Sequence, residues 1–378
     1  MIKLGLTTLL QEKAELIKGR SIGLITNATG VDEELRDNVS LLWTDSRFDL
    51  KALFAPEHGF WGAVQDALSI SSAIDDRTKT PVYSLYGENR KPTSDMLENI
   101  DVLTFDIQDV GSRFYTFIST MLLSMESAAQ CGVTFIVLDR PNPINGIAVE
   151  GNVLAPKFSS FVGKHPLPVR HGLTVGELAR LFKAELKLDL ELEVVKMQGW
   201  RRNMWYDNTG LQWVLPSPNM PTLTTATLYP GTCFIEGTNI SEGRGTTKPF
   251  ELIGAPWISA YQFADELNSL ELPGVKFRPA FFTPAFSKYK GELCQGIQVH
   301  LLDRDLLQPV ETGLRIIQKA LELYPEDFQW RRSFFDLLAG NDEVRKKLSG
   351  GMDVGELVNS WAPKLSAFKE KRLEYLIY

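Results

Sequence analysis

Cysteine and histidine are scarce in this sequence of 378 residues. The three cysteines, Cys131, Cys233 and Cys294, lie far apart and form no CxxC pair, and the four histidines include no HExxH motif. A disulfide framework or a structural zinc site needs clustered ligands, so neither is expected. We interpret the cysteines as buried thiols.

The sequence also lacks a net positive charge and long apolar runs. The net charge of −7 argues against general nucleic-acid binding, and it requires a locally positive pocket for any anionic substrate. The first 19 residues contain neither a small-residue cleavage site nor an apolar run long enough to span a membrane. We therefore expect a cytoplasmic protein, or a periplasmic or secreted one if a signal segment is missing. The oligomeric state is not marked in the sequence.

The common phosphate and nucleophile motifs are absent as well. No GxGxxG follows the first predicted strand, and neither GxxxxGK[ST] nor GxSxG occurs anywhere. The sequence therefore gives no support for a dinucleotide site, a nucleoside triphosphate site or a serine-hydrolase elbow.

Short apolar runs, alternating with helical patterns, fill the first two thirds of the chain. We expect Gly132 to end one of the helices and another to begin near Thr174. Such alternation predicts an α/β fold with a mostly parallel sheet covered by helices on both faces. The predicted strands are 21–27, 50–55, 81–87, 101–106, 134–139, 190–197 and 232–237.

The last third has a different pattern. A helix is expected at 260–267, an alternating strand at 295–303, and further helices from about residue 310. We therefore predict two domains, 1–250 and a smaller α+β domain at 251–378. The irregular stretch 198–225, rich in Trp, Pro and Asn, is typical of a binding loop.

Polar motifs follow the predicted strands, where ligands bind in open α/β sheets. Together they predict a polar cleft along one edge of the sheet. These motifs are Asn27, 56–59, 87–89, 106–111, 139–143 and 236–239.

Carboxylates are the main chemical resource of this cleft. Glycoside hydrolysis commonly needs two, one as acid and one as nucleophile or base. Glu57, Glu236 and Glu242 are the candidates. Each has a plainer alternative, because Glu57 could cap a helix, Glu236 could orient a neighbour and Glu242 could pair with Arg244.

The other polar side chains leave similar alternatives open. Asp106 and Asp109 could contact sugar hydroxyls or cap a helix, and His58 and His171 could bind substrate or be structural. Arg113, Arg140 and Arg244 could bind a carboxylate through a bidentate fork or belong to structural ion pairs. Asn142 and Asn219 sit between prolines in rigid loops, and Trp200, Trp205 and Trp213 could stack on sugar or simply pack.

Taken together, long motifs in this sequence resemble the NamZ-type exo-β-N-acetylmuramidases, which are peptidoglycan exo-hexosaminidases. The resemblance spans about residues 23–301, and the C-terminal tail after them is also similar. The matching stretches read GLITNATGVD, LFAPEHGFWG, PVYSLYGENRKPT, DVLTFDIQDVGSRFYTFISTM, VLDRPNPINGIAVEGNVL, PVRHGLTVGELARLF, GWRRNMWYD, PSPNMPTLTTATLYPGTCFIEGTNISEGRGTTKPFELIGAPW and FSKYKGELCQGIQVHL.

The resemblance implies a Rossmann-like catalytic domain, an auxiliary domain that contributes to the cleft, and no metal or organic cofactor. It implies release of terminal β-linked N-acetylmuramic acid (MurNAc) from the non-reducing ends of disaccharides or short glycans of the MurNAc-GlcNAc type. The lactyl carboxylate of that sugar would bind Arg113, Arg140 or Arg244. The carried-over residues are Glu57, Asp106, Asp109, Arg113, Asn142, Asn219, Glu236, Asn239, Glu242 and Arg244, and the expected substrate-binding set adds Asn27, His58, Tyr115, Asp139, Arg140 and His171.

Two other functions stay open on the sequence. One is a metal-dependent hydrolase of a sugar ester, amide or phosphate, with Asp106, Asp109, His58 and His171 as ligands. The other is a carbohydrate-binding protein without catalytic activity, because one fold can host many functions.

Overall fold

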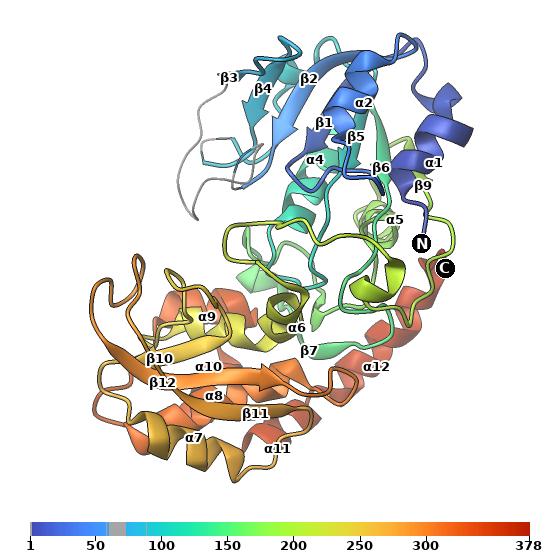
Figure 1. Cartoon of the computed structure of the whole chain (residues 1–378). Helices are drawn as coiled ribbons and strands as arrows, with labels where there is room; N and C mark the ends of the chain where they lie inside the picture. Colours follow the sequence, from blue (N-terminus) through green and yellow to red (C-terminus); the bar gives the residue numbers. More distant parts are fainter. Residues whose placement is uncertain (1, 58, 60–72, 88) are drawn as a thin grey trace.

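Six of the seven strands predicted between residues 21 and 237 lie in one sheet. The computed structural model describes residues 2–57, 59, 73–87 and 89–378, and in these the strand order is β3-β4-β2-β1-β5-β6-β9 (Figure 1). All neighbours run parallel except β3, which is antiparallel to β4. The strands are β1 (Ser21–Thr26), β2 (Asp49–Ala55), β3 (Ala73–Ile74), β4 (Pro81–Ser84), β5 (Val102–Asp106), β6 (Thr134–Leu138) and β9 (Leu192–Val195).

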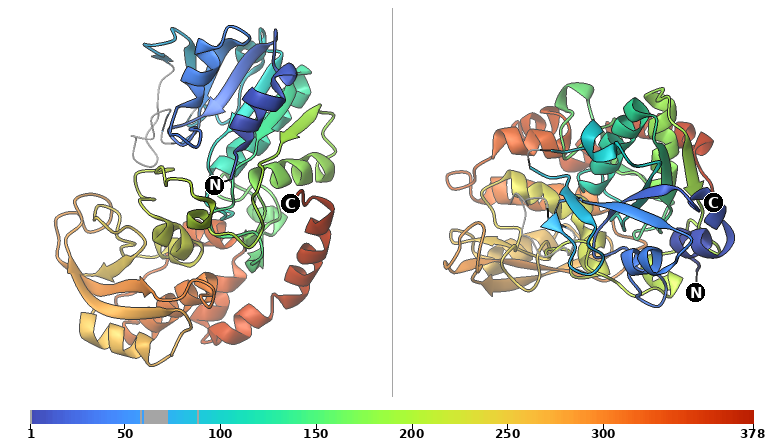
Figure 2. Two further views of the ribbon diagram at one scale, coloured as in Figure 1. Left: turned by 45° about the vertical axis from the view of Figure 1, so that its right-hand side comes forward. Right: turned by 90° about the horizontal axis from the view of Figure 1, so that it is seen from above.

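Alternate residues of the central strands enter two hydrophobic cores, which is why helices cover both faces of the sheet. On one face Val102 and Ile136 pack with α1 (Gly5–Glu12) and α2 (Asn38–Thr44). On the other face Leu103 and Phe135 pack with α4 (Phe117–Cys131) and α5 (Val175–Glu185) (Figure 2). The expected Rossmann-like arrangement is confirmed.

The boundaries of two helices follow the sequence signals. Gly132 ends α4 with a left-handed backbone at φ 68°, which glycine adopts without strain. Thr174 begins α5 through a capping box with Glu177. The short α3 (Ser94–Leu97) completes the helices of this half.

A smaller α+β assembly follows, as expected. Its antiparallel sheet has the order β10-β12-β11, and helices pack against it below the larger sheet (Figure 1). A separate hairpin joins β7 (Glu150–Val153) to β8 (Pro168–Arg170). The remaining elements are α6 (Leu223–Thr232), β10 (Leu252–Ala255), α7 (Ala260–Asn268), β11 (Val275–Phe282), β12 (Cys294–Leu301), α8 (Pro309–Leu323), α9 (Arg332–Ala339), α10 (Glu343–Ser349), α11 (Val354–Asn359) and α12 (Ala362–Lys371), with 3₁₀ turns η1 (Ala14–Leu16), η2 (Pro156–Phe158), η3 (Tyr206–Thr209), η4 (Cys233–Gly237) and η5 (Arg372–Glu374).

Two predictions are wrong. The strand expected at 232–237 is the end of α6 followed by the 3₁₀ turn η4. A short apolar run reads the same in a buried strand and a buried helix, so periodicity could not separate them. Cys131, expected to be buried, is exposed because it occupies the last turn of α4, whereas Cys233 and Cys294 are buried.

The larger hydrophobic core continues from the sheet into the C-terminal helices. It contains Phe105 of β5, Phe234 of η4 and Phe368 of α12 within one contact cluster. The 3₁₀ turn after α12 also returns to the first half, where the Arg372 guanidinium donates to the carbonyl oxygens of Gly146 and Ile147. None of the described helices is long and apolar enough to cross a membrane.

Helices α6 and α8 cross at unusually close range. A Cβ atom added to Gly231 would lie 1.7 Å from the carbonyl oxygen of Pro309, and one added to Gly313 would lie 2.2 Å from the carbonyl oxygen of Gly231. Both obstacles are backbone atoms, which cannot rotate away. This contact therefore requires glycine on both helices.

We predict that Gly231→Ala lowers the free energy of unfolding by roughly 3 kcal/mol, because the two helices must separate to admit the methyl group. Urea denaturation measures this change. The control is Gly350→Ala, where the nearest atom to the added Cβ would lie 3.3 Å away and the expected change is within about 0.5 kcal/mol. Equal stability of Gly231→Ala and the native protein would show that the crossing adjusts without cost.

Candidate active site

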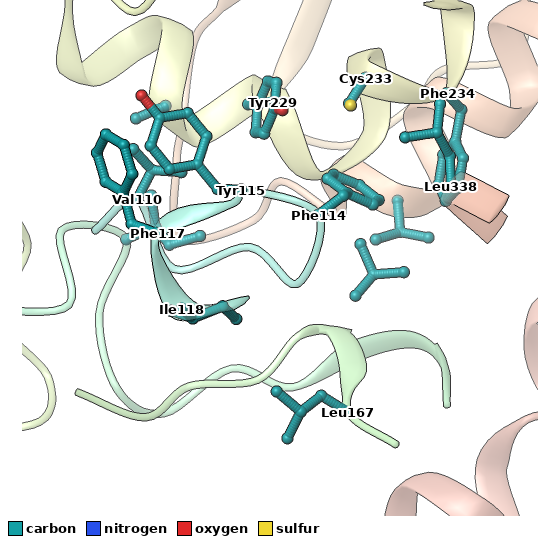
Figure 3. Close-up of a cluster of buried hydrophobic side chains, with 14 of the residues drawn as sticks. Val110, Phe114, Tyr115, Phe117, Ile118, Leu167, Tyr229, Cys233, Phe234 and Leu338 are labelled. Carbon is teal, nitrogen blue, oxygen red and sulfur yellow. The ribbon is translucent and has the colours of Figure 1, made fainter. Parts of the chain in front are cut away.

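A cavity of about 280 Å³ lies where the carboxyl ends of β2, β4 and β5 face α6, η4 and α9. Its floor is apolar, and Phe114 and Tyr115 from the segment after β5 lie against Tyr229 of α6 (Figure 3). The polar residues stand on its walls. The lining residues are Glu57, Tyr86, Arg90, Phe114, Tyr115, Thr116, Phe161, Val162, Ser217, Asn219, Met220, Tyr229, Glu236, Arg244, Phe250, Phe334 and Leu338.

A larger hollow of about 930 Å³ lies at the opposite edge of the sheet. It is lined by Arg20, Asp101 and Thr134, which precede or begin strands β1, β5 and β6. Ligands of open α/β sheets bind at the carboxyl ends of the strands, and the predicted polar motifs lie there too. The smaller cavity is therefore the candidate active site.

Glu57 reaches the cavity from the turn after β2. Its Oε2 accepts a hydrogen bond of 2.7 Å from the Thr116 hydroxyl, which stands at the start of α4. Among the described residues, no cation is within ion-pair distance of Glu57. The carboxyl group thus faces an aromatic cavity with a single hydroxyl donor. His58, the next residue, lies outside the described residues.

Glu236 reaches the same cavity from η4. Its Oε1 accepts from Arg244 Nε at 2.7 Å, and its Oε2 lies 3.4 Å from the Cys233 sulfur. The Arg244 guanidinium also stacks over Phe250, with 5.0 Å between the guanidinium carbon and the ring centroid. Arg244 is therefore held from two sides and fixes the orientation of Glu236.

Glu242 lies behind this wall and is only 2% exposed. Its carboxylate is 2.9 Å from Lys288 Nζ and 3.5 Å from Arg244 Nε. Burial alone would raise the pKa of Glu242, but the two cations hold it below the ordinary value of 4.5. Glu242 is thus a buried anion that binds two cations of the site rather than a cavity-lining group.

Lys288 was missed by sequence reasoning. Besides pairing with Glu242, its ammonium donates to the carbonyl oxygens of Ile235 and Ile240, which flank Glu236 and the loop after it. The residue lies in the matched stretch FSKYKGELC, but a lone lysine carries no chemical motif. Only the folded geometry shows that it secures the loop.

Asp106 and Arg140 form a buried ion pair at the carboxyl ends of β5 and β6 instead of lining the cavity. Their atoms Oδ1 and Nε are 2.6 Å apart, and the other carboxylate oxygen accepts from Asn38 Nδ2. Arg140 also donates to the carbonyl oxygen of Val31. The geometry joins the ends of β5 and β6 and does not fit the expected substrate-binding role of either residue.

Arg113 is also placed away from substrate, because its guanidinium is buried among backbone carbonyl groups. It donates to the carbonyl oxygens of Asn152, Leu167, Leu338 and Ala339 at 2.7–3.0 Å. Burial without an acidic partner lowers its pKa to about 9. The expected binding of a substrate carboxylate does not fit this position.

Three other expected residues are buried and have hydrogen-bond partners within the protein. Asp139 accepts from Gly176 and the Tyr378 hydroxyl, and burial raises its pKa to about 7. His171 Nδ1 accepts from the Leu173 amide, and burial lowers the pKa of His171 to about 3. Asp109 Oδ2 accepts from the Gly111 amide, and burial raises its pKa to about 7 despite that bond.

The expected asparagines divide between the cavity and the loops. Asn219 lines the cavity. In both Asn142 and Asn239, the side-chain Nδ2 donates to a backbone carbonyl oxygen and the side-chain Oδ1 accepts from a backbone amide. These hydrogen bonds hold the loops that carry them. Asn27 Oδ1 accepts from the Thr29 amide and hydroxyl at the end of β1. The structure thus brings together Glu57, Tyr115, Asn219, Glu236 and Arg244 in the cavity, with Glu242 directly behind.

The tryptophans of the irregular segment do not line this cavity. Trp200 and Trp205 are buried, and the Trp205 indole donates to Asp305. Trp213 donates to the Met220 carbonyl oxygen and thereby braces the loop that carries Asn219. Packing is their role in this structure.

The metal-dependent alternative finds no ligand set in the part of the chain that the structure describes. No group of three or more His, Cys, Asp or Glu side chains is arranged there to hold a metal ion. Asp106 is committed to Arg140, and His171 is buried beside the α5 N-terminus. Asp106 would have to give up its ion pair with Arg140 to act as a ligand.

Comparison with known families decides the assignment. The N-terminal model of the family described as "Exo-beta-N-acetylmuramidase NamZ" matches residues 22–224, and its C-terminal model matches residues 227–378. The chain belongs to the NamZ family of exo-β-N-acetylmuramidases. It is therefore a member of a family of glycoside hydrolases.

Relatives of this NamZ-family chain match it from end to end. The peptidoglycan β-N-acetylmuramidase NamZ of Bacillus subtilis (strain 168) is 52% identical over 378 residues, which are 100% of this chain and 91% of that protein. Two solved DUF1343 family proteins of Bacteroides fragilis NCTC 9343 are 41% and 31% identical, with TM-scores of 0.93 and 0.80. Each comparison covers 100% of this chain and 99% of the other.

We predict that Lys288→Met lowers the free energy of unfolding of this NamZ-family chain by about 3–5 kcal/mol near pH 7, because Glu242 becomes a buried charge with one cation fewer. In the native protein the lowered pKa of Glu242 contributes stability above pH 4.5, which is lost as pH falls through the folded pKa. In the variant burial raises that pKa, so the deficit shrinks at lower pH.

Urea denaturation of both proteins at about pH 5 and about pH 7 measures this difference. Lys290→Met is the matched control, because Lys290 is exposed two residues away and should change stability by no more than about 0.5 kcal/mol. A deficit that is the same at both pH values would contradict the role of Lys288 as the counter-ion of Glu242.

Proposed function

We propose that this protein is an exo-acting hydrolase that releases terminal β-linked MurNAc from the non-reducing ends of peptidoglycan-derived disaccharides or short glycans. The observation that carries the proposal is the cavity that is lined by both Glu57, from the turn after β2, and Glu236, from η4. Two carboxylates on either side of a bound sugar are what glycosidic cleavage requires.

The surroundings of the two carboxyl groups suit different roles. Glu57 accepts a hydrogen bond from the Thr116 hydroxyl, has aromatic neighbours in the cavity and has no cation within ion-pair distance among the described residues. Glu236 is paired with Arg244, which favours a carboxylate able to act as nucleophile or base. We therefore propose Glu57 as the acid and Glu236 as its partner, with Glu242 positioning Arg244.

The size of the cavity supports cleavage at a chain end. At about 280 Å³ it is at the lower limit for small-molecule pockets, so it suits one terminal sugar better than a continuous glycan strand. Asn219, between two prolines, offers an amide to sugar hydroxyl groups. Tyr115 and Tyr229 offer aromatic surface to the apolar face of the ring.

We also propose that residues 1–250 form the catalytic domain and residues 251–378 an auxiliary domain. In this division the auxiliary part contributes Phe334 and Leu338 to the cavity wall from α9. All three candidate carboxylates then lie in the catalytic part.

We predict that Glu57→Gln and Glu236→Gln each lower kcat by about 10²- to 10⁴-fold while the folded state is retained, because the amide can neither donate a proton as an acid nor carry charge. Mass spectrometry of MurNAc released from MurNAc-GlcNAc measures the rate. Circular dichroism checks the fold. GlcNAc-MurNAc, the reversed disaccharide, should yield no MurNAc, and EDTA should leave the native rate unchanged.

Glu98→Gln is the control, because Glu98 lines the hollow at the opposite edge of the sheet and its loss should leave the rate unchanged. Full activity of Glu57→Gln would remove that residue from the mechanism. Rapid release from the reversed disaccharide would refute the proposed direction of attack.

A further inference from the structure

The charge of the cavity raises a question about its substrate. Among the described residues, Glu57 and Glu236 bring carboxyl groups to its walls, and the whole chain has a net charge of −7. The inference that follows rests on the proposed function, in which the terminal sugar carries a lactyl carboxylate. Such an anion enters this cavity only if a cation there binds it.

The arginines expected from the sequence already have partners within the protein. Arg113 is surrounded by backbone carbonyl oxygens, and Arg140 is paired with Asp106 outside the cavity. Arg244 lines the cavity, but it already lies 2.7 Å from Glu236 and 3.5 Å from Glu242. A third anion at Arg244 would have to compete with both.

Arg90 differs from these residues in place and in partners. It is an exposed cavity-lining residue in the segment after β4. Its guanidinium carbon lies 5.0 Å from the centroid of the Phe161 ring, and that ring lies 5.9 Å from the Tyr86 ring. Within the described parts of the chain, no carboxylate is in ion-pair distance of Arg90.

Stacking on an aromatic ring prepares a guanidinium for carboxylate binding. The ring contacts the flat face of the group and leaves the N–H groups along its edge available. Two of these N–H groups match the two oxygens of a carboxylate. Phe161 comes from the loop after η2, so two separate segments of the chain place Arg90 on the cavity wall.

We propose that Arg90, supported by Phe161, binds the lactyl carboxylate of the terminal sugar and determines the specificity of the site. The contact requires a free carboxylate. An amide at the same position, as in a glycan that still carries its peptide, lacks the negative charge and presents only one acceptor oxygen. The site therefore selects sugars from which the peptide has been removed.

The test compares an aryl β-N-acetylmuraminide with the same compound in which the lactyl carboxylate is converted to its methylamide. For the native protein, kcat/KM should be higher for the free acid. Arg90→Gln should lower kcat/KM for the acid by about 10- to 100-fold, mainly through KM, and change the amide by less than about 2-fold. Arg90→Lys should recover part of the loss, and Phe161→Leu should lower the acid's kcat/KM in the same direction.

Arg47→Gln is the matched control, because Arg47 stacks on Phe48 outside the cavity, with 4.9 Å from guanidinium carbon to ring centroid. An equal loss for both substrates in Arg90→Gln, or no loss, would overturn the inference while leaving the proposed function in place.

A second readout separates the inference from the proposed function. Isothermal titration of Glu57→Gln with free MurNAc and with N-acetylglucosamine should show tighter binding of MurNAc. The additional variant Arg90→Gln should remove that preference. Binding of MurNAc by a native protein that does not cleave MurNAc-GlcNAc would refute the proposed function alone, and absence of binding to either sugar would refute both.

Discussion

The shape of the cavity depends on one buried cation. Arg113 enters from the segment between β5 and α4, where its next neighbours Phe114, Tyr115 and Thr116 line the cavity. Its guanidinium donates to the carbonyl oxygens of Leu338 and Ala339 at the end of α9, and Leu338 lines the cavity from the other side. The partial negative charge of a helix C-terminus stabilises a cation there without a carboxylate. One side chain thus connects both walls.

A second set of charges determines the electrostatic surroundings of Glu236. Lys288, Glu242, Arg244 and Glu236 form a chain of alternating sign from the interior to the cavity surface. Each charge has a neighbour of opposite sign, which is the condition under which buried ions are tolerated. Of these four residues, Arg244 and Glu236 line the cavity, and Glu242 and Lys288 are not among its lining residues. Glu57 stands outside this chain, so the two carboxyl groups experience different electrostatic surroundings.

The local sequence pattern was sufficient to predict the strands of the large sheet, but it was insufficient to predict the structure of the residues around Glu236. Six strands were predicted close to their observed limits, because strands that are buried along all or part of their length read as short apolar runs. The run at 232–237 has the same composition but continues helix α6, and the contact of Gly231 with Pro309 that holds it there is distant in sequence. The division at residue 250 stays a prediction.

The motifs were sufficient to predict which residues lie near the site. They were not sufficient to predict the role of each charged residue. Glu57, Asn219, Glu236 and Arg244 were named from the sequence and lie together in the cavity. Arg113 and Arg140 carry the same charge and lie in equally distinctive motifs, yet they face carbonyl groups and Asp106. Burial decides these roles, and burial depends on the whole fold. Arg90 and Lys288 escaped notice because a single basic residue has no spacing to recognise.

The hydrophobic core that both halves of the chain share affects how this protein unfolds and how its sequence can change. Two family models divide the chain near residue 225, as if two modules had been joined. Yet Phe105, Phe234 and Phe368 belong to one hydrophobic cluster, so neither module can lose its packing without exposing the other. We therefore expect the chain to unfold as a single cooperative unit. Its two halves must also change together over evolutionary time, because a substitution at their shared core alters the stability of both.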